Sequence, residues 1–211
     1  MKRWAAALVA LVASACGGIS VHNPLKPLPP ASTTAVTPAA PQPAGAAAMV
    51  LALPDLGSGW TRIAADTRSV GLQEAITGDP VHLKRIERHA YRSGYEAMFG
   101  GENRLALQSR ALVWSTRAKA QRIYAVGLRK LARATPRLRR RAAPAGTPGS
   151  GFVLFTGRIP VGSRRVRAYF GVWLHGTVIG TVLMVGRGAS GSVVVNYARL
   201  EDEKIARALG R

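Results

Sequence analysis

The stretch AYFGVWLHGTVIGTVLMVG, residues 168–186, decides the fold of this 211-residue chain. It carries no charge apart from His175, and its length would suit a membrane-spanning helix. Four glycines interrupt it, however, and most of its other residues are Val, Ile, Thr, Tyr or Phe, which favour strands. Arginines flank it on both sides, without the one-sided bias that orients membrane helices. We therefore expect two strands, Val166–Leu174 and Thr177–Val185, joined by a His175-Gly176 turn.

Three further strands are predicted upstream of this hairpin. Phe152–Ile159 is one, and Leu105–Trp114 alternates between apolar and other residues as a half-buried strand does. Tyr91 to Phe99 alternates in the same way, so one face should carry Tyr91, Ser93, Tyr95, Ala97 and Phe99. Gly100-Gly101 is expected to form the turn that makes a hairpin of the two earlier strands.

Helical patterns separate and close these strands. Ser115 or Thr116 should cap a helix that runs to about Ala134, and a second helix is expected over Ser192–Leu209. Asp79-Pro80 is a typical start for a short helix that reaches about Arg88. The apolar stripe of the first helix consists of Ala120, Ile123, Tyr124, Gly127, Leu128 and Leu131. This order predicts an α+β single domain, with a mostly antiparallel sheet covered by helices on one face.

The N-terminus has the pattern of a signal peptide, residues 1–15. Lys2 and Arg3 precede an apolar run, Trp4 to Val12, and small residues follow it. A bilayer span needs about 20 apolar residues, so this shorter run should not remain in the membrane. We expect cleavage after Ala15, which makes Cys16 the first residue of the mature chain.

The motif Ala13-Ser14-Ala15-Cys16 resembles the lipobox of bacterial lipoproteins, in which the cysteine thiol takes a diacylglycerol. This resemblance implies that Cys16, the only cysteine, attaches the protein to a membrane of the cell envelope through palmitate-type acyl chains. The alternative is ordinary secretion, because Ala-x-Ala is also a common secretory cleavage signal and Ala13 stands where leucine is usual. In that case Cys16 would be a free thiol.

Residues 16–48 are expected to be a disordered, lipid-anchored linker. Seven of the 13 prolines lie in this segment, and Lys26 is its only charged residue. Such a composition buries too little apolar surface to fold, and its prolines favour extended chain. The α+β domain is then expected over residues 49–211, held at some distance from the membrane.

The chain is strongly basic, with 30 Lys and Arg against 10 Asp and Glu, and a formal net charge of +20. Such a charge attracts anionic surfaces, although the codon bias of a high-GC genome also favours arginine. Basic residues are densest between Arg117 and Arg141, a segment without acids. We therefore propose contacts with anionic lipid head groups or envelope polymers, rather than nucleic acid, which does not suit an exported protein. The candidate contacts are Arg137, Arg139, Arg140 and Arg141. A solvated helix face and a mobile loop are the alternative.

Catalytic and cofactor motifs are weak. Residues 186–191, GRGASG, match the dinucleotide fingerprint G-x-G-x-x-G, but too few residues follow to supply the second strand and the acid that it needs. His82 and His89 are about 10 Å apart along a helix, too far for one metal ion, and we expect no cofactor. No serine lies in a G-x-S-x-G elbow. Glu201, on the apolar side of the last helix, is expected to pair with an arginine, or with His175 in an unrecognised active site.

The domain also resembles envelope lipoproteins of high-GC bacteria and the extracellular sensor domains of their membrane kinases. The resemblance rests on residues 53–60, LPDLGSGW, on residues 116–120, TRAKA, and on residues 173–178, WLHGTV. It implies binding or sensing at the envelope. We therefore expect a lipid-anchored, non-catalytic ligand- or envelope-binding module, with an envelope enzyme as the alternative.

The lipid anchor makes the first testable prediction. Cys16→Ser should leave export intact but release the protein from the membrane fraction, because serine cannot form the thioether. Mass spectrometry of the mature wild-type N-terminus should show a diacylglyceryl-modified Cys16. An unmodified mature N-terminus would contradict the anchor while leaving the export signal in place.

Overall fold

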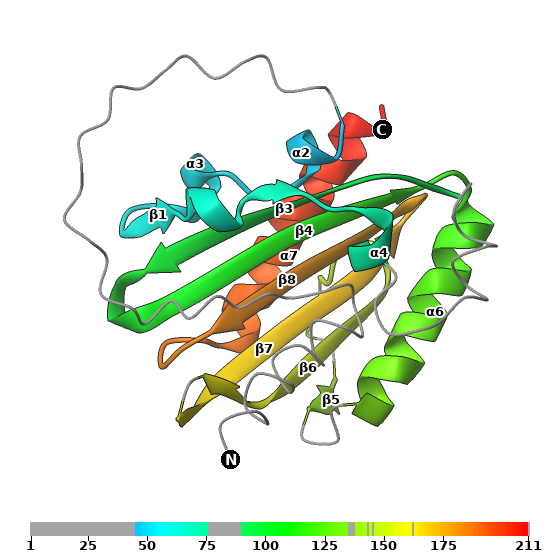
Figure 1. Cartoon of the computed structure of the whole chain (residues 1–211). Coiled ribbons are helices and arrows are strands. Elements are labelled where there is room, and N and C mark those ends of the chain that lie inside the picture. The colour runs from blue at the N-terminus through cyan, green and yellow to red at the C-terminus, as the bar shows by residue number, and fades with distance from the viewer. Residues whose placement is uncertain are drawn as a thin grey trace.

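A computed structural model describes residues 45–75, 90–134, 138–142, 144, 146–161 and 163–210 (Figure 1). Several sequence-based expectations fall outside these residues. They are the signal peptide, Cys16, nearly all of the linker, the short helix over 79–88, and Arg137.

Within the described residues, eight strands form one antiparallel sheet in the order β1-β3-β4-β8-β7-β6-β5, with β2 paired to β3 beside this path. The strands are β1 (Trp60–Arg62), β2 (Arg68–Ser69), β3 (Tyr91–Gly101), β4 (Leu105–Trp114), β5 (Arg139–Arg141), β6 (Ser150–Val161), β7 (Arg164–His175) and β8 (Val178–Val185). The predicted α+β class and the antiparallel sheet are confirmed.

Among the described residues, α-helices precede β1, lie between β2 and β3 and between β4 and β5, and follow β8. The α-helices described are α2 (Ala46–Met49), α3 (Leu53–Leu56), α4 (Leu72–Ala75), α6 (Arg117–Ala134) and α7 (Gly191–Ala208). Two 3-10 turns, η1 (Ala64–Asp66) and η2 (Glu102–Arg104), complete the set. No described helix has the length and hydropathy to cross a membrane.

The stretch 168–186 folds as a hairpin of β7 and β8 rather than as a helix. His175 pairs with Val178, so the turn residues are Gly176 and Thr177, one position later than expected. Gly176 has a φ of +57°, a left-handed conformation that glycine adopts at no steric cost. All eight residues of β8 are buried, since this strand lies between β4 and β7.

The two long helices pack on opposite faces of the sheet, which corrects the expectation that helices cover a single face. Along β8, Val182 belongs to a core cluster that includes α7 residues such as Val194 and Ile205. Its neighbour Leu183 belongs to the other cluster, which includes Ala120 and Leu131 of α6. Figure 1 shows α7 behind the central strands and α6 along one side. The reason is that the central strand β8 buries residues on both faces, so both need cover.

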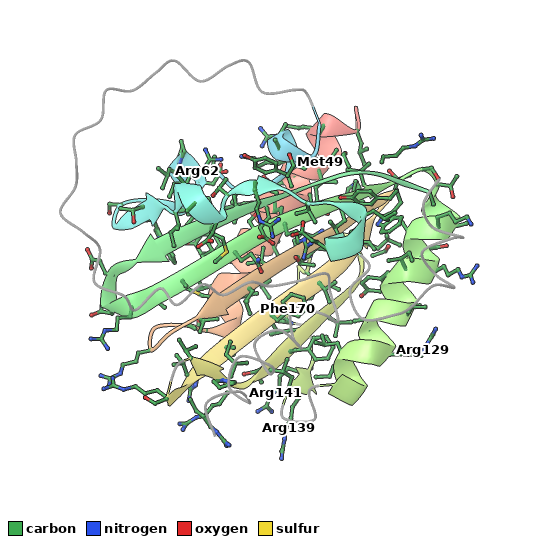
Figure 2. All side chains as sticks on the ribbon, viewed as in Figure 1. Met49, Arg62, Arg129, Arg139, Arg141 and Phe170 are labelled. Atoms are coloured by element: carbon green, nitrogen blue, oxygen red, sulfur yellow. The ribbon has the colours of Figure 1, made fainter. Side chains whose placement is uncertain are left out.

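Helix α6 has the predicted bounds and stripe. Ala120 and Leu131 are fully buried, and Tyr124 and Leu128 pack against the same core. Thr116 Oγ1 accepts a hydrogen bond from the Lys119 backbone N–H at 3.3 Å, which is the expected N-cap. Arg122 and Arg129 lie opposite this stripe and are exposed, and Figure 2 labels Arg129 on the outer side of the helix.

Local details of the β3–β4 hairpin differ from the prediction. A register irregularity between Tyr91 and Ser93 moves the Tyr91 ring to the α6 face, where it packs edge-on against Trp114. The glycines 100 and 101 are paired strand residues, and the turn is Glu102–Arg104 instead. A bulge of this kind shifts the alternation by one residue without leaving a hydrophobic signal.

The contact between Gly180 and Trp173 generates a prediction about stability. These residues face each other across β7 and β8, and a Cβ at position 180 would lie 2.5 Å from Cε2 of the buried Trp173 ring. Gly180→Ala should therefore lower the free energy of unfolding by about 1–3 kcal/mol through overpacking. Denaturant unfolding followed by tryptophan fluorescence measures this change.

Gly100→Ala is the matched control. This strand glycine would place its Cβ at ordinary van der Waals distance, 3.6 Å from Thr61 Oγ1. Equal effects of the two substitutions would show that the Trp173 contact is not responsible.

Candidate functional site

A gap at one end of the sheet arises from unequal strand lengths. Val185, the last residue of β8, pairs with both Ala106 of β4 and Ala168 of β7. Strand β7 extends past this point through residues 164–167, and these four residues pair with β6 but not with β8. The chain instead leaves the sheet through Gly186, towards α7. The space that a longer β8 would fill is therefore open.

Gly186 makes this sharp departure possible. Its φ is +140°, and a Cβ at this position would lie 2.8 Å from Leu105 Cδ2 and 2.9 Å from the Arg104 carbonyl oxygen. The run 186–191 that matches the dinucleotide motif is thus the tight connection expected from the sequence. Within this run, Ser190 Oγ caps α7 by accepting the Val193 N–H at 3.3 Å.

The gap forms a cavity of about 740 Å³ between three chain connections. We call it the arginine notch. Its lining comes from the β3–β4 turn, the β6–β7 hairpin and the β8–α7 connection, and contains no acidic residue among those that the structure describes. The lining residues are Asn103, Arg104, Ala106, Arg158, Val161, Arg164, Arg165, Val166, Arg167, Val185, Gly186 and Arg187. Six of these are arginines, and all six are exposed.

The six arginines of the notch have no salt bridge within the described part of the chain. Arg158 and Arg167 even lie directly opposite each other on β6 and β7, an arrangement of like charges that weakens a strand pair. Elsewhere, cations do have acidic partners, as Lys204 has in Asp55 at 2.6 Å. Because a cavity lined by one sign of charge concentrates counter-ions, the notch is suited to an anion.

The arginines singled out from the sequence lie elsewhere. Arg139, Arg140 and Arg141 form β5, an exposed edge strand that pairs with residues 154–156 of β6. This segment had been expected to be a loop. Figure 2 shows Arg139 and Arg141 at the outer rim of the sheet. They do not line the notch, and their contact with anionic surfaces remains a prediction.

Glu201 is completely buried between α7 and the sheet, and its partner is not an arginine. Ser109 Oγ donates a hydrogen bond to Glu201 Oε2, and it accepts one from the Leu51 N–H at 2.8 Å. Glu201 Oε1 has no hydrogen-bond partner within the described residues. Burial raises the pKa of Glu201 well above its usual value, while the Ser109 hydrogen bond and the Thr181 backbone amide oppose this shift.

His175 contacts Asp202 rather than Glu201, so the suggested catalytic pair is not formed. His175 Nδ1 lies 2.8 Å from Asp202 Oδ1, and Trp173 Nε1 donates to the same oxygen at 2.9 Å. Asp202 Oδ2 accepts the Gly149 N–H at 3.0 Å. Asp202, which the sequence analysis did not single out, therefore fastens α7 to the end of β7 and to the loop before β6.

His82 and His89 lie outside the described residues, and three tryptophans have structural roles. Trp114 and Trp173 are core residues, and Trp60 packs edge-on against Tyr197. Among the described residues, no three His, Cys, Asp or Glu side chains are grouped as metal ligands.

Comparison with known proteins identifies a shared fold. No protein-family model matches the chain, and no curated protein matches it. Among solved structures, it is similar to the extracellular domain of PknH from Mycobacterium tuberculosis, with a TM-score of 0.51 and 10% sequence identity. The match covers 78% of this chain and 95% of that domain. At this identity the likeness shows the fold.

The buried Glu201 leads to a prediction about pH. Because its pKa is higher in the folded state, its ionisation destabilises the fold as the pH rises above the unfolded value of about 4.3. Glu201→Gln keeps an acceptor for Ser109 but cannot ionise. The difference in Tm between this variant and the wild type should therefore become more positive as the pH is raised from 5 to 8, as measured by thermal unfolding.

Glu203→Gln, at an exposed position of α7, is the control and should show a smaller change across this range. A constant Tm difference between Glu201→Gln and wild type would contradict the destabilising ionisation.

Proposed function

We propose that this protein is a lipid-anchored, extracytoplasmic binding module without catalytic activity, and that its ligand is anionic. The observation that carries the proposal is the arginine notch, a cavity whose described lining contains six arginines and no acid. Its volume of about 740 Å³ lies within the range of known ligand sites, roughly 300–1,000 Å³.

The chemistry of the notch favours phosphate or carboxylate groups. A guanidinium is always charged and presents a planar set of donors that matches two oxygens of either group. A bound anion would also relieve the repulsion between close arginines such as Arg158 and Arg167. Ligand binding thus offsets an electrostatic cost that the free protein carries.

The location supports an envelope ligand. The signal peptide and Cys16 indicate export and membrane attachment, and the structural neighbour is itself an extracellular domain. Anionic lipid head groups and envelope polymers lie within reach of a module tethered by the predicted linker that precedes α2. The basic edge strand β5 provides a second surface that would attract the same anionic molecules.

Two charge-matched variants test the proposal. Arg158→Gln/Arg165→Gln/Arg167→Gln removes three charges from the notch, and Arg139→Gln/Arg140→Gln/Arg141→Gln removes three from β5. Hexametaphosphate should raise the Tm of the full chain in neutral detergent. At about 100 times Kd, mass action stabilises the folded state by about 2.7 kcal/mol. The notch variant should lose most of this response, and the β5 variant should keep it.

Other outcomes discriminate between the two basic surfaces. Loss confined to the β5 variant would assign anion binding to the edge strand instead. Equal losses of the Tm response in both variants would indicate that hexametaphosphate is attracted to the net charge of the protein and does not bind at a defined site. Absence of any response in the wild type would overturn the proposal.

A further inference from the structure

The turn that carries Arg104 has an unusual backbone. Asn103 and Arg104 have φ values of +54° and +61°, in the left-handed region that glycine adopts readily. Asparagine tolerates this region because its side chain can bond locally, but arginine gains no such compensation. The fold therefore holds an arginine at a position where glycine would be more stable.

Arg104 lies across the end of β8 from four of the other five notch arginines. The fifth, Arg187, belongs to the β8–α7 connection. Arg104 lies in the β3–β4 turn, whereas Arg158, Arg164, Arg165 and Arg167 belong to the β6–β7 hairpin. The close packing of Gly186 against the Arg104 carbonyl fixes this turn against the base of the notch.

Uncharged residues lie between Arg104 and the arginines of the β6–β7 hairpin. Val185 is the end of the short strand β8 and pairs with Ala106 of β4, and both residues line the notch. Both are buried. Cations on two sides of an uncharged base match a ligand with two anionic groups better than they match a single small anion.

We propose that the notch binds a ligand with two linked phosphate-type groups, one held by Arg104 and the other by the arginines of the β6–β7 hairpin. This inference rests on the proposed anion-binding function and specifies its ligand class. Arg104 is the specificity-determining residue, retained in a strained conformation because it contacts the ligand. The same pair of groups occurs in soluble diphosphates and in lipid head groups with two phosphates.

Isothermal titration calorimetry on the full chain in neutral detergent tests this inference. Inorganic pyrophosphate should bind about tenfold or more tightly than orthophosphate, since each additional charge-assisted contact contributes that much. Arg104→Gly and Arg104→Gln should both weaken pyrophosphate binding by about tenfold or more and change orthophosphate binding little. Arg129→Gln, which removes one charge from the exposed face of α6, should leave both unchanged.

Thermal unfolding without ligand provides a second readout. Arg104→Gly should raise the Tm by about 2–4 °C because it relieves the left-handed arginine, whereas Arg104→Gln should not. A rise in Tm with unaltered pyrophosphate binding would show that Arg104 has no role in binding and would overturn the inference.

The source of the phosphates is distinguished by micelles doped with cardiolipin, which has two phosphates, or with phosphatidylglycerol, which has one, at equal phosphate concentration. Tighter binding to cardiolipin than to phosphatidylglycerol that depends on Arg104 would identify a lipid head group as the ligand. Tighter binding to pyrophosphate than to orthophosphate, without a preference for cardiolipin, would identify a soluble ligand. If neither diphosphate is preferred while hexametaphosphate still acts through the notch, the inference fails and the proposed function stands. If hexametaphosphate has no effect either, both fail.

Discussion

The structure depends on covering both faces of β8, whose residues from Val178 to Val185 are all buried. A strand that is apolar on both sides must lie between two cores, and its backbone groups need partners along both edges. Strands β4 and β7 pair with its edges, α7 covers one face, and a core that includes α6 covers the other. The arginine notch is open because β8 ends early, at Val185. The same strand therefore determines both the hydrophobic core and the position of the candidate site.

Long periodic segments could be predicted from sequence, and short or locally irregular ones could not. Helix α6 has the predicted extent because its apolar stripe recurs at helical spacing from Ala120 to Leu131. Tyr91 faces the opposite side to the one predicted, since a bulge leaves no trace in the pattern. β5 has three polar residues and so no hydrophobic period at all. The partner of Glu201, Ser109, is 92 positions away, a contact that only the folded topology creates.

The sequence pointed to arginines as binding residues but to the wrong part of the chain for the notch. Local density favoured Arg139–Arg141, whereas the notch arginines come from three separate connections that meet only because neighbouring strands differ in length. One signal was present: no acidic residue lies between Glu102 and Glu201, and all six notch arginines fall in that interval. The separation of basic from acidic residues can be recognised in the sequence. The cavity that brings these arginines together depends on where β8 ends.

The order of strands has a consequence for folding kinetics. Strand β3 pairs with β4, and β7 pairs with both β6 and β8, in each case through short connections. Each group can therefore form as a local unit. The β4–β8 pairing joins these units across a long loop that contains α6, as in Ala111 opposite Gly180. Closing that loop has an entropic cost that local hairpins avoid, which makes this pairing the late step of assembly. The arginine notch lies between the β3–β4 unit and the β6–β7–β8 unit. A molecule that binds residues of both units would therefore slow their separation during unfolding.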